Sequence, residues 1–427
     1  MAHRPRYGDQ TVIDARRAPD GVPLRTRRTL AAVAAILAIA TFAGILLLRP
    51  QGSTKSDLAA RGVSLPAEVY EGRVLSVRDA PCPGTLPEQN IVCSRISVGM
   101  REGPDGGRTV SIERPQTEGA IRYGAGDDVV LAYEPNAPPE LRYRIVDRER
   151  TSPLLWLTVL FAGAVVALGR LRGVAALTGL VATFVVLLLF VLPSILDGRS
   201  PLMVSVVGAS AIAFLALYLA HGFDPKTTVA LLGTLASLIL TAILASVFVE
   251  AAQISGLASE EATIIRIGAA QIDLSGLILG GVVIGALGAI DDMTVTQASA
   301  VWELRTANPL MPRADLVRSG LRIGRDHVAA TVNTLFLAYA GASMPLLILF
   351  ILSQQSLVTV ANGEVVATEI VRTLVGSVGL VASVPITTWL AAHIAPAPSP
   401  RTPTAATTPA AGESSSSEAA TPRRGGS

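Results

Sequence analysis

The stretch VAALTGLVATFVVLLLFVLPSIL, residues 174–196, runs its whole length without a charged side chain. A helix needs about 20 mostly apolar residues to cross a lipid bilayer, and this stretch has that length. The chain holds about eight such candidates: residues 30–48, 154–168, 174–196, 202–219, 227–249, 274–290, 328–352 and 371–394. The sequence therefore predicts a mainly α fold, a polytopic helical membrane bundle.

The overall composition agrees with this fold class. Charged residues make up 16% of the chain, whereas a soluble globular protein has roughly 25%. Aromatic residues are scarce at 4%, so alanine, valine, leucine and glycine supply most of the apolar mass. Such a composition favours closely packed helices with small residues at their contacts, and a lipid bilayer as the main partner.

The positive charges predict how the spans are oriented. Arginines are concentrated in residues 1–28 and again in residues 305–325. Nucleic-acid binding is the alternative explanation for such runs, but beside apolar spans they favour cytoplasmic loops of a plasma-membrane protein. With eight spans and the N-terminus in the cytoplasm, every strongly basic loop and the C-terminus fall in the cytoplasm. Residues 50–151 then fall outside.

That outside segment has the pattern of a small β domain between the first two spans. Residues 69–77, 91–98, 109–113 and 129–133 alternate partly in strand fashion, and Asp105-Gly106-Gly107 has the composition of a hairpin turn. About five short strands predict a small barrel, of which the OB type is one candidate. Cys82 and Cys93 bracket a proline-rich loop, and outside the cytoplasm we favour a disulfide between them over two free thiols.

The ends of the chain have a different composition from the spans. Residues 396–427 are rich in Pro, Ser, Thr and Ala, which predicts a disordered tail, and the basic N-terminal tail is similar. The predicted organisation is a disordered cytoplasmic tail at 1–28, an anchor helix at 29–49, the extracytoplasmic β domain at 50–151, a seven-helix domain at 152–395 and a second disordered tail at 396–427.

The sixth span is unusually rich in glycine. Its glycines are Gly276, Gly280, Gly281, Gly285 and Gly288. Spacings of four residues place glycines on one stripe, where a neighbouring helix can approach closely. Tight helix packing is the first interpretation. The second is a helix that unwinds at glycine and exposes its backbone carbonyls to a substrate or an ion.

A polar face follows that span. If the helix continues past Asp291, then Asp292, Thr296, Ser299 and Glu303 recur at steps of four, three and four and share one side. Two carboxylates and two hydroxyls on one face could coordinate a hard cation or relay protons. The alternative is that the paired aspartates only solvate the end of the helix.

The last two spans add further polar residues. Asn333 lies within the apolar seventh span, so its amide should face the bundle interior, either bonded to another helix or as a ligand. Pro345 should kink this helix or sit where its missing hydrogen bond is tolerated. Glu369 and Arg372, three residues apart, could form a local ion pair at the start of the eighth span.

Signatures of enzymes are missing from the sequence. It contains no Gly-x-Ser-x-Gly elbow, no His-Glu-x-x-His helix and no phosphate-binding loop. We therefore predict no enzyme, no catalytic residue, no cofactor and no metal site. Intramembrane hydrolysis by Asp291 or Asp292 is a remote alternative, because no second aspartate in a matching apolar span accompanies them.

Three sets of residues resemble the YibE/F-like family of bacterial multi-pass membrane proteins. They are Gly285-Ala286-Leu287-Gly288 with Asp292, Thr296-Gln297-Ala298-Ser299-Ala300 and Glu303-Leu304; then Gly324-x-Asp326 with Asn333-Thr334, Leu337-Ala338-Tyr339 and Gly341-x-Ser343-x-Pro345; then Glu369-Ile370-Val371-Arg372 with Gly376, Gly379 and Pro385-Ile386-Thr387. The resemblance spans roughly residues 65–394. It implies a multi-spanning plasma-membrane protein, but no substrate, cofactor or catalytic residue. This chain has an additional acidic residue, Asp291, directly before the motif's Asp292, so either aspartate is a candidate.

Two functions are expected from these features. The first is a transporter or permease for a small solute or ion, gradient-driven or passive unless a partner supplies energy. Asp291, Asp292, Thr296, Ser299, Glu303 and Asn333 are the candidate residues of its pathway. The second is an envelope binding or signalling protein that uses the β domain to hold a partner. A homo-oligomer is compatible with either function.

Overall fold

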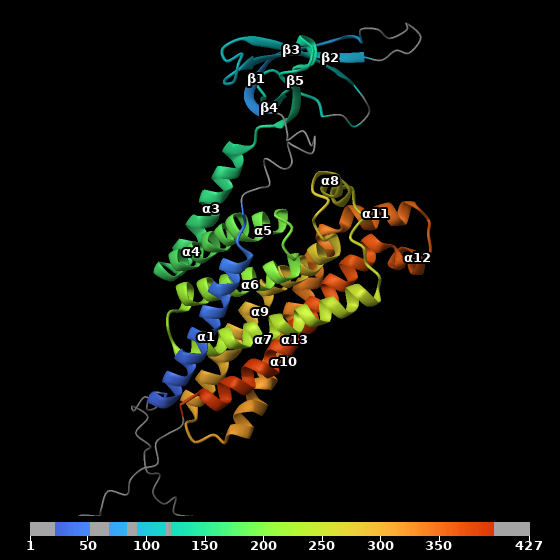
Figure 1. Ribbon diagram of the computed structural model, residues 1–427. Helices are drawn as coiled ribbons and strands as arrows, with labels where there is room; N and C mark the ends of the chain where they lie inside the picture. Colours follow the sequence, from blue (N-terminus) through green and yellow to red (C-terminus); the bar gives the residue numbers. More distant parts are fainter. Residues whose placement is uncertain (1–21, 52–67, 83–91, 117–118, 120, 397–427) are drawn as a thin grey trace, which may run out of the picture.

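A helical bundle and a small sheet make up the computed structural model, which describes residues 22–51, 68–82, 92–116, 119 and 121–396. The sheet lies beyond one end of the bundle and joins it through the first helix and the helix that follows the last strand (Figure 1). The predicted combination of a helical bundle with a β domain between its first two long helices is confirmed.

The bundle consists of long helices with two short ones at its edge. The long helices are α1 (Leu24–Leu48), α3 (Thr151–Gly169), α4 (Leu171–Val186) continued by η3 (Leu187–Val191) and α5 (Leu192–Leu196), α6 (Pro201–His221), α7 (Pro225–Ala251), α9 (Leu274–Ala307), α10 (Arg313–Ala342) followed after a bend by the nine-residue α11 (Met344–Leu352), and α13 (Glu364–Ile394). The short helices, α8 (Glu260–Gly268) and α12 (Leu357–Asn362), were not predicted.

Within the described ranges, seven helices are long and apolar enough to cross a membrane. An eighth span results if α10 and α11, which meet at an angle of 61°, count as one. The bend occurs at Ser343, and Pro345 occupies the first turn of α11. A proline has no N–H to donate, and the first turn of a helix is where that loss costs nothing. The predicted effect of Pro345 is therefore confirmed.

Three boundaries differ from the prediction. Helix α1 begins at Leu24, so residues 24–28, assigned to a disordered tail, are helical, because arginine is a good helix former and Pro23 precedes the first turn. The remaining parts of the predicted tails, residues 1–21 and 397–427, lie outside the described residues. Helix α9 continues to Ala307, and α10 begins at Arg313, so most of the basic stretch is helical.

The centre of the bundle is formed by α7, α9 and α13, which pack against one another, with α6 and α10 on their flanks. Side chains that are almost wholly buried join the three helices, among them Leu238, Ile290 and Leu380. Several contacts depend on glycine. A Cβ atom at Gly233 of α7 or at Gly379 of α13 would collide with the Thr387 or the Thr241 hydroxyl of a facing helix. Small residues therefore set the close spacing of the central helices.

The β domain is a five-stranded antiparallel sheet that curls into half a barrel. Its strands are β1 (Glu68–Pro81), β2 (Val92–Met100), β3 (Thr109–Pro115), β4 (Asp128–Tyr133) and β5 (Tyr143–Arg148), in the order β3-β2-β1-β4-β5. The concave side buries Val74, Ile96, Val98 and Leu131. The Asp105-Gly106-Gly107 turn does connect β2 to β3, and Gly107 adopts a φ of 78°, which favours glycine.

A disulfide joins Cys82, just after β1, to Cys93 in β2. This is the pairing that the sequence favoured. Residues 83–91, the proline-rich loop between them, lie outside the described residues. Because Cys93 of β2 pairs in register with Ala80 of β1 and with Pro115 of β3, the bond fixes the end of β1, the central strand, to the strand beside it.

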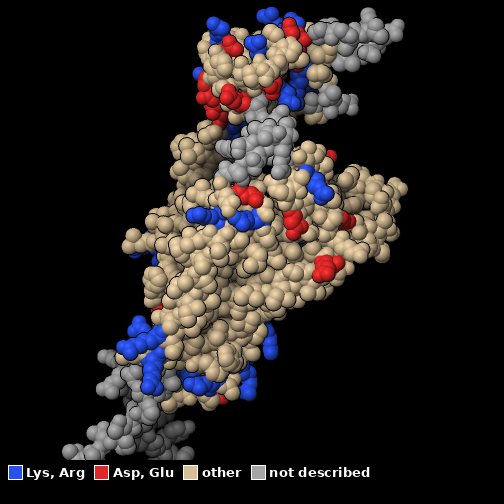
Figure 2. Space-filling model, viewed as in Figure 1, with Lys and Arg blue, Asp and Glu red and all other residues tan. Residues whose placement is uncertain are grey.

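The charges are distributed unevenly over the surface. Figure 2 shows positive side chains gathered at the lower end of the bundle, and above them a broad belt of uncharged residues. Val22 and Pro396, the first and last described residues, line one pocket at this end, with the sheet at the opposite end. An uncharged belt with basic residues at one edge is typical of a multi-pass membrane protein.

Candidate functional site

The glycines of α9 divide between two faces. Gly276 and Gly280 are buried, and a Cβ atom at either would press on Pro201 or Ser205 of α6. These two glycines therefore serve tight packing, the first of the two interpretations. The second interpretation, a helix that unwinds at glycine, is wrong for this conformation. Helix α9 is continuous from Leu274 to Ala307, because its backbone hydrogen bonds are not interrupted at any glycine.

The remaining glycines lie on a more open face. A Cβ atom at Gly285 would lie 2.6 Å from the Tyr339 hydroxyl of α10, whereas one at Gly288 would meet nothing within 4 Å. Gly288 is followed on the same stripe by the predicted polar residues, which the continuous helix does place on one side: Asp292, Thr296, Ser299 and Glu303. Asp292 and Glu303 are exposed, and Thr296 and Ser299 are half-buried. We call this stripe, from Gly288 to Glu303, the polar face.

Asp291 points to the other side of the helix, toward the interior. It lies near the middle of α9 rather than at its end, and it is half-buried beside the fully buried Ile290. The Thr234 hydroxyl of α7 lies 3.5 Å from Asp291 Oδ1, at the long limit of a hydrogen bond. The same hydroxyl lies only 2.7 Å from the Thr294 hydroxyl, which donates to the Asp291 carbonyl oxygen at 2.9 Å.

This arrangement leaves the Asp291 carboxylate weakly satisfied. A threonine hydroxyl has one hydrogen to donate. Since Thr294 donates to a backbone carbonyl, the hydrogen of Thr234 is best placed to bond Thr294, not Asp291. A carboxylate held in an apolar interior with one long hydrogen bond favours a proton or a cation as its partner.

Gln297 is a central residue that the pattern analysis did not select. Its side chain is 2% exposed, and its Nε2 atom donates to the Gly320 carbonyl of α10 at 2.8 Å and to the Thr388 hydroxyl of α13 at 2.6 Å. Thr388 in turn donates to the Val384 carbonyl of its own helix. Gln297 thus ties three helices together. One sequence signal could have identified Gln297. It is a polar residue directly after Thr296, on the side of α9 away from the polar face.

Asn333 does not face the interior, and that prediction is wrong. Its side chain is exposed, as are the neighbouring Thr334 and Phe336. Helix α10 packs against α9 and α13 through its first half, where Leu316, Gly320 and Gly324 are buried. The rotation of α10 about its own axis decides which residues of its second half face inward. Tyr339, not Asn333, points toward α9. The structure therefore does not bring Asn333 to Asp291.

The predicted ion pair of the last span is present near the sheet end of the bundle. Arg372 Nη1 lies 3.4 Å from Glu369 Oε1. Both side chains line a pocket of about 250 Å³ between α8, α9 and α13, together with Glu261, Glu364 and Thr368. The Ser255 hydroxyl and the Gly256 N–H donate to Glu364, which ties the loop before α8 to the start of α13.

No group of three or more His, Cys, Asp or Glu side chains that could hold a metal ion occurs among the described residues. Asp291 and Asp292 do not add to a common carboxylate site, because they are neighbours along one helix and point to different sides.

Comparison with known proteins gives one match. The family described as YibE/F-like protein matches residues 157–397, more than half of the chain. The match begins inside α3, so it covers the helices from there to α13 and leaves α1 and the β domain outside, whereas the sequence resemblance was expected to start near residue 65. No curated protein and no solved structure matches the chain.

Proposed function

Since the chain belongs to the YibE/F-like family and folds as a bundle of apolar helices, we propose that it is a membrane permease for a small solute or ion. The observation that carries this proposal is Asp291, an ionisable side chain near the middle of a span with only one long hydrogen bond. An ionisable residue inside a membrane is costly to keep, and where it occurs it commonly marks an ion or proton pathway.

The polar face supplies the second half of the argument. Gly288 leaves space beside α9, and the half-buried Thr296 and Ser299 continue that face toward the basic end of the bundle. In this proposal a cation approaches along this face past Asp292, and Asp291 is the adjacent carboxylate on the helix. Asp291 would bind it, with the Thr234 and Thr294 hydroxyls as further oxygen ligands. Asn333 is not part of this pathway.

The test is ion flux through the reconstituted full-length protein. We expect vesicles with an imposed gradient of protons, Na⁺ or K⁺ to show flux of at least one of these ions above that of empty vesicles. Asp291→Asn should abolish this flux, and Asp292→Asn should reduce it. Asn333→Ala is the matched control, because it removes an exposed polar group from α10 and should leave flux unchanged.

Each result has a defined meaning. Flux that survives Asp291→Asn at normal protein levels would remove Asp291 from the pathway. Absence of flux for all three ions would count against an ion permease. The transported substrate would then have to be a neutral or anionic solute. Absence of uptake of such solutes as well would contradict the proposal.

A second candidate function has a specific observation in its favour, namely a groove of about 260 Å³ on the β domain. It crosses β1, β2 and β3 and is lined by Asp79, Ser94, Arg114, Gln116 and Tyr123, among others. Gln116 Nε2 donates to Asp79 and Ser94 at 2.7 and 2.6 Å, so the groove is pre-ordered. We propose that it holds an envelope partner outside the cytoplasm.

The topology of the sheet supports recognition by this groove. The strand order β3-β2-β1-β4-β5, with β3 and β5 in contact, favours the OB type, whose second and third strands form a binding face. A photo-crosslinking residue at Arg114 in the full-length protein should capture a discrete partner in intact cells. Arg144, exposed on β5 and absent from the groove lining, is the control position. Equal capture at both positions, or none, would remove this candidate.

A further inference from the structure

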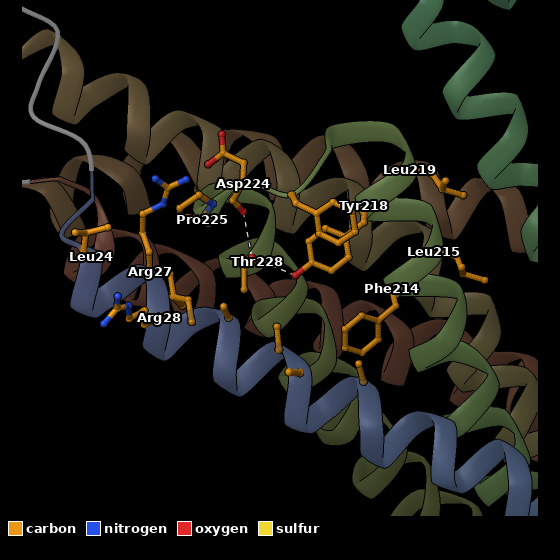
Figure 3. A pocket seen from close by; sticks show the side chains of 16 residues that line it. Leu24, Arg27, Arg28, Phe214, Leu215, Tyr218, Leu219, Asp224, Pro225 and Thr228 are labelled. Carbon is orange, nitrogen blue, oxygen red and sulfur yellow. Dashed lines mark hydrogen bonds between the residues drawn. The ribbon is translucent and has the colours of Figure 1, made fainter.

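A large cavity, which Asp291 does not line, lies between α1, α6 and the start of α7. It has a volume of about 760 Å³, within the roughly 300–1,000 Å³ of small-molecule sites. Figure 3 shows α1 along one side, with Arg27 and Arg28 near its beginning, and Phe214, Leu215, Tyr218 and Leu219 of α6 along the other.

The cavity arises because α1 lines it only with alanine beyond Leu30. The residues of α1 that line its length are Ala31, Ala34, Ala35 and Ala38. Leu30 is buried against Val229 and Ala391 near one end of α1, and Gly44 approaches Val207 of α6 near the other end. Helix α1 thus touches the bundle closely near both ends and has only small side chains between these contacts. This leaves an elongated apolar groove along the outside of the bundle.

The wall on the α6 side is a row of aromatic rings. Phe214 and Tyr218 have ring centroids 6.2 Å apart, and Phe223 stacks on Tyr218 at 4.6 Å. Tyr218 is fixed by a hydrogen bond of 3.1 Å between its hydroxyl and that of Thr228. An apolar wall of this length, open on the side that would face lipid, fits a hydrocarbon chain better than a polar solute.

The mouth of the groove carries positive charge. Arg27 and Arg28 line it, and among the described residues neither forms an ion pair. They lie near the N-terminus of α1, the positive end of the helix dipole, and the first turn of α1 has no acidic residue. One carboxylate, Asp224, also lines the mouth, but it accepts the Lys226 N–H at 3.0 Å and caps α7. An anion between the two arginines would therefore be stabilised.

We propose that this groove is a binding site for an anionic phospholipid. The phosphate of its head group lies between Arg27 and Arg28, and one acyl chain lies along the alanines of α1 and the aromatic row of Phe214, Tyr218 and Phe223. The depth of the site in the membrane agrees with a lipid head group. Arg27 also lines a second pocket with Phe223 and Trp302, and aromatic residues of this kind mark the membrane interface. This site is independent of the pathway proposed above.

The test is native mass spectrometry of the full-length protein exchanged against defined mixtures of phosphatidylglycerol and phosphatidylcholine. We expect the wild-type protein to retain phosphatidylglycerol preferentially. Arg27→Gln together with Arg28→Gln should lower that preference by about fivefold for each arginine. Arg25→Gln is the control, because it removes the same charge from the same turn without lining the groove. An unchanged preference in the double variant, or an equal loss in Arg25→Gln, would overturn the proposal.

A second pair of variants tests the acyl-chain half of the site. Ala35→Phe fills the groove and should reduce retention of the lipid while both arginines remain. Ala40→Phe adds the same side chain at an exposed position of α1 outside the groove and should have no effect. Retention by Ala35→Phe equal to that of Ala40→Phe would overturn the proposal, and it does so even if the double arginine variant fails to fold.

Discussion

The hydroxyl of Thr234 in α7 lies 2.7 Å from the hydroxyl of Thr294 in α9, and this bond joins the two helices directly beside the Asp291 carboxylate. Both threonines are fully buried. Their hydrogen bond uses the Thr234 hydrogen, which could otherwise be donated to the Asp291 carboxylate. The hydrogen-bonding capacity of this carboxylate is therefore incompletely satisfied.

Gln297→Leu should destabilise the bundle. The change removes the two hydrogen bonds that Gln297 donates to the Gly320 carbonyl and to the Thr388 hydroxyl, which costs about 1–2 kcal/mol within a membrane bundle. The melting temperature of the purified protein in detergent measures the effect. Ser299→Ala, on the half-buried polar face of the same helix, should change it little. Equal melting temperatures for wild type and Gln297→Leu would contradict the structural role of Gln297.

Alanine at the packed glycines should destabilise the protein, whereas alanine at Gly288 should not. An added Cβ atom at Gly233 or Gly379 collides with a threonine of the facing helix, and overpacking of this kind costs about 1–3 kcal/mol. Gly288 has open space in front of it, so Gly288→Ala should be neutral or slightly stabilising. The measurement is the melting temperature of each of the three variants and of the wild-type protein. A loss for Gly288→Ala as large as that for Gly379→Ala would show that the polar face is occupied by a helix.

The disulfide predicts a specific chemical behaviour. The chain has two cysteines and both are in the bond, so the folded protein should take up no thiol reagent until it is reduced, and two equivalents afterwards. Replacement of Cys82 and Cys93 by serine should destabilise the β domain by about 2–3 kcal/mol, the value for closing a loop of this length. Attachment of a thiol reagent to the unreduced protein, detected as an increase in its mass, would contradict the disulfide.

Tyr143 should make the β domain sensitive to alkaline pH. Burial raises the pKa of Tyr143 to about 12, and its hydrogen bond of 3.0 Å to Asp105 acts in the same direction. A phenol with a raised pKa stabilises the fold fully below its unfolded pKa of about 10, and this stability is lost as the pH rises from about 10 to about 12. Unfolding followed by circular dichroism across this range should show the loss, and Tyr143→Phe should show a smaller one. Identical alkaline transitions would contradict this assignment.

Much of the fold could be predicted because it depends on local composition. The apolar spans, the four strands identified by alternation, the hairpin turn at Asp105-Gly106-Gly107 and the break near Pro345 each follow from residues close in sequence. Helices α8 and α12 were missed because they are short and lie between longer apolar runs, where they have no span-length signal.

The site was predicted less well because it depends on which way each helix turns. Sequence periodicity correctly places Asp292, Thr296, Ser299 and Glu303 on one face, but it does not say what that face meets. Asn333 illustrates the difficulty, since burial of an amide was expected from its apolar surroundings, yet the contacts of α10 through Gly320 and Gly324 turn it outward. Asp291 and Gln297 acquire their partners only from α7, α10 and α13, which are distant in sequence.

The most direct test of the central claim is whether water and ions reach Asp291. In a background with Cys82 and Cys93 replaced by serine, single cysteines would be placed at Asp291 and at Ile290, its fully buried neighbour. A membrane-impermeant thiol reagent would then be applied to intact cells and to inverted vesicles. The proposed pathway predicts labelling of Asp291→Cys from at least one side, with no labelling of Ile290→Cys. Protection of Asp291→Cys from both sides would contradict it and reduce Asp291 to a packing residue.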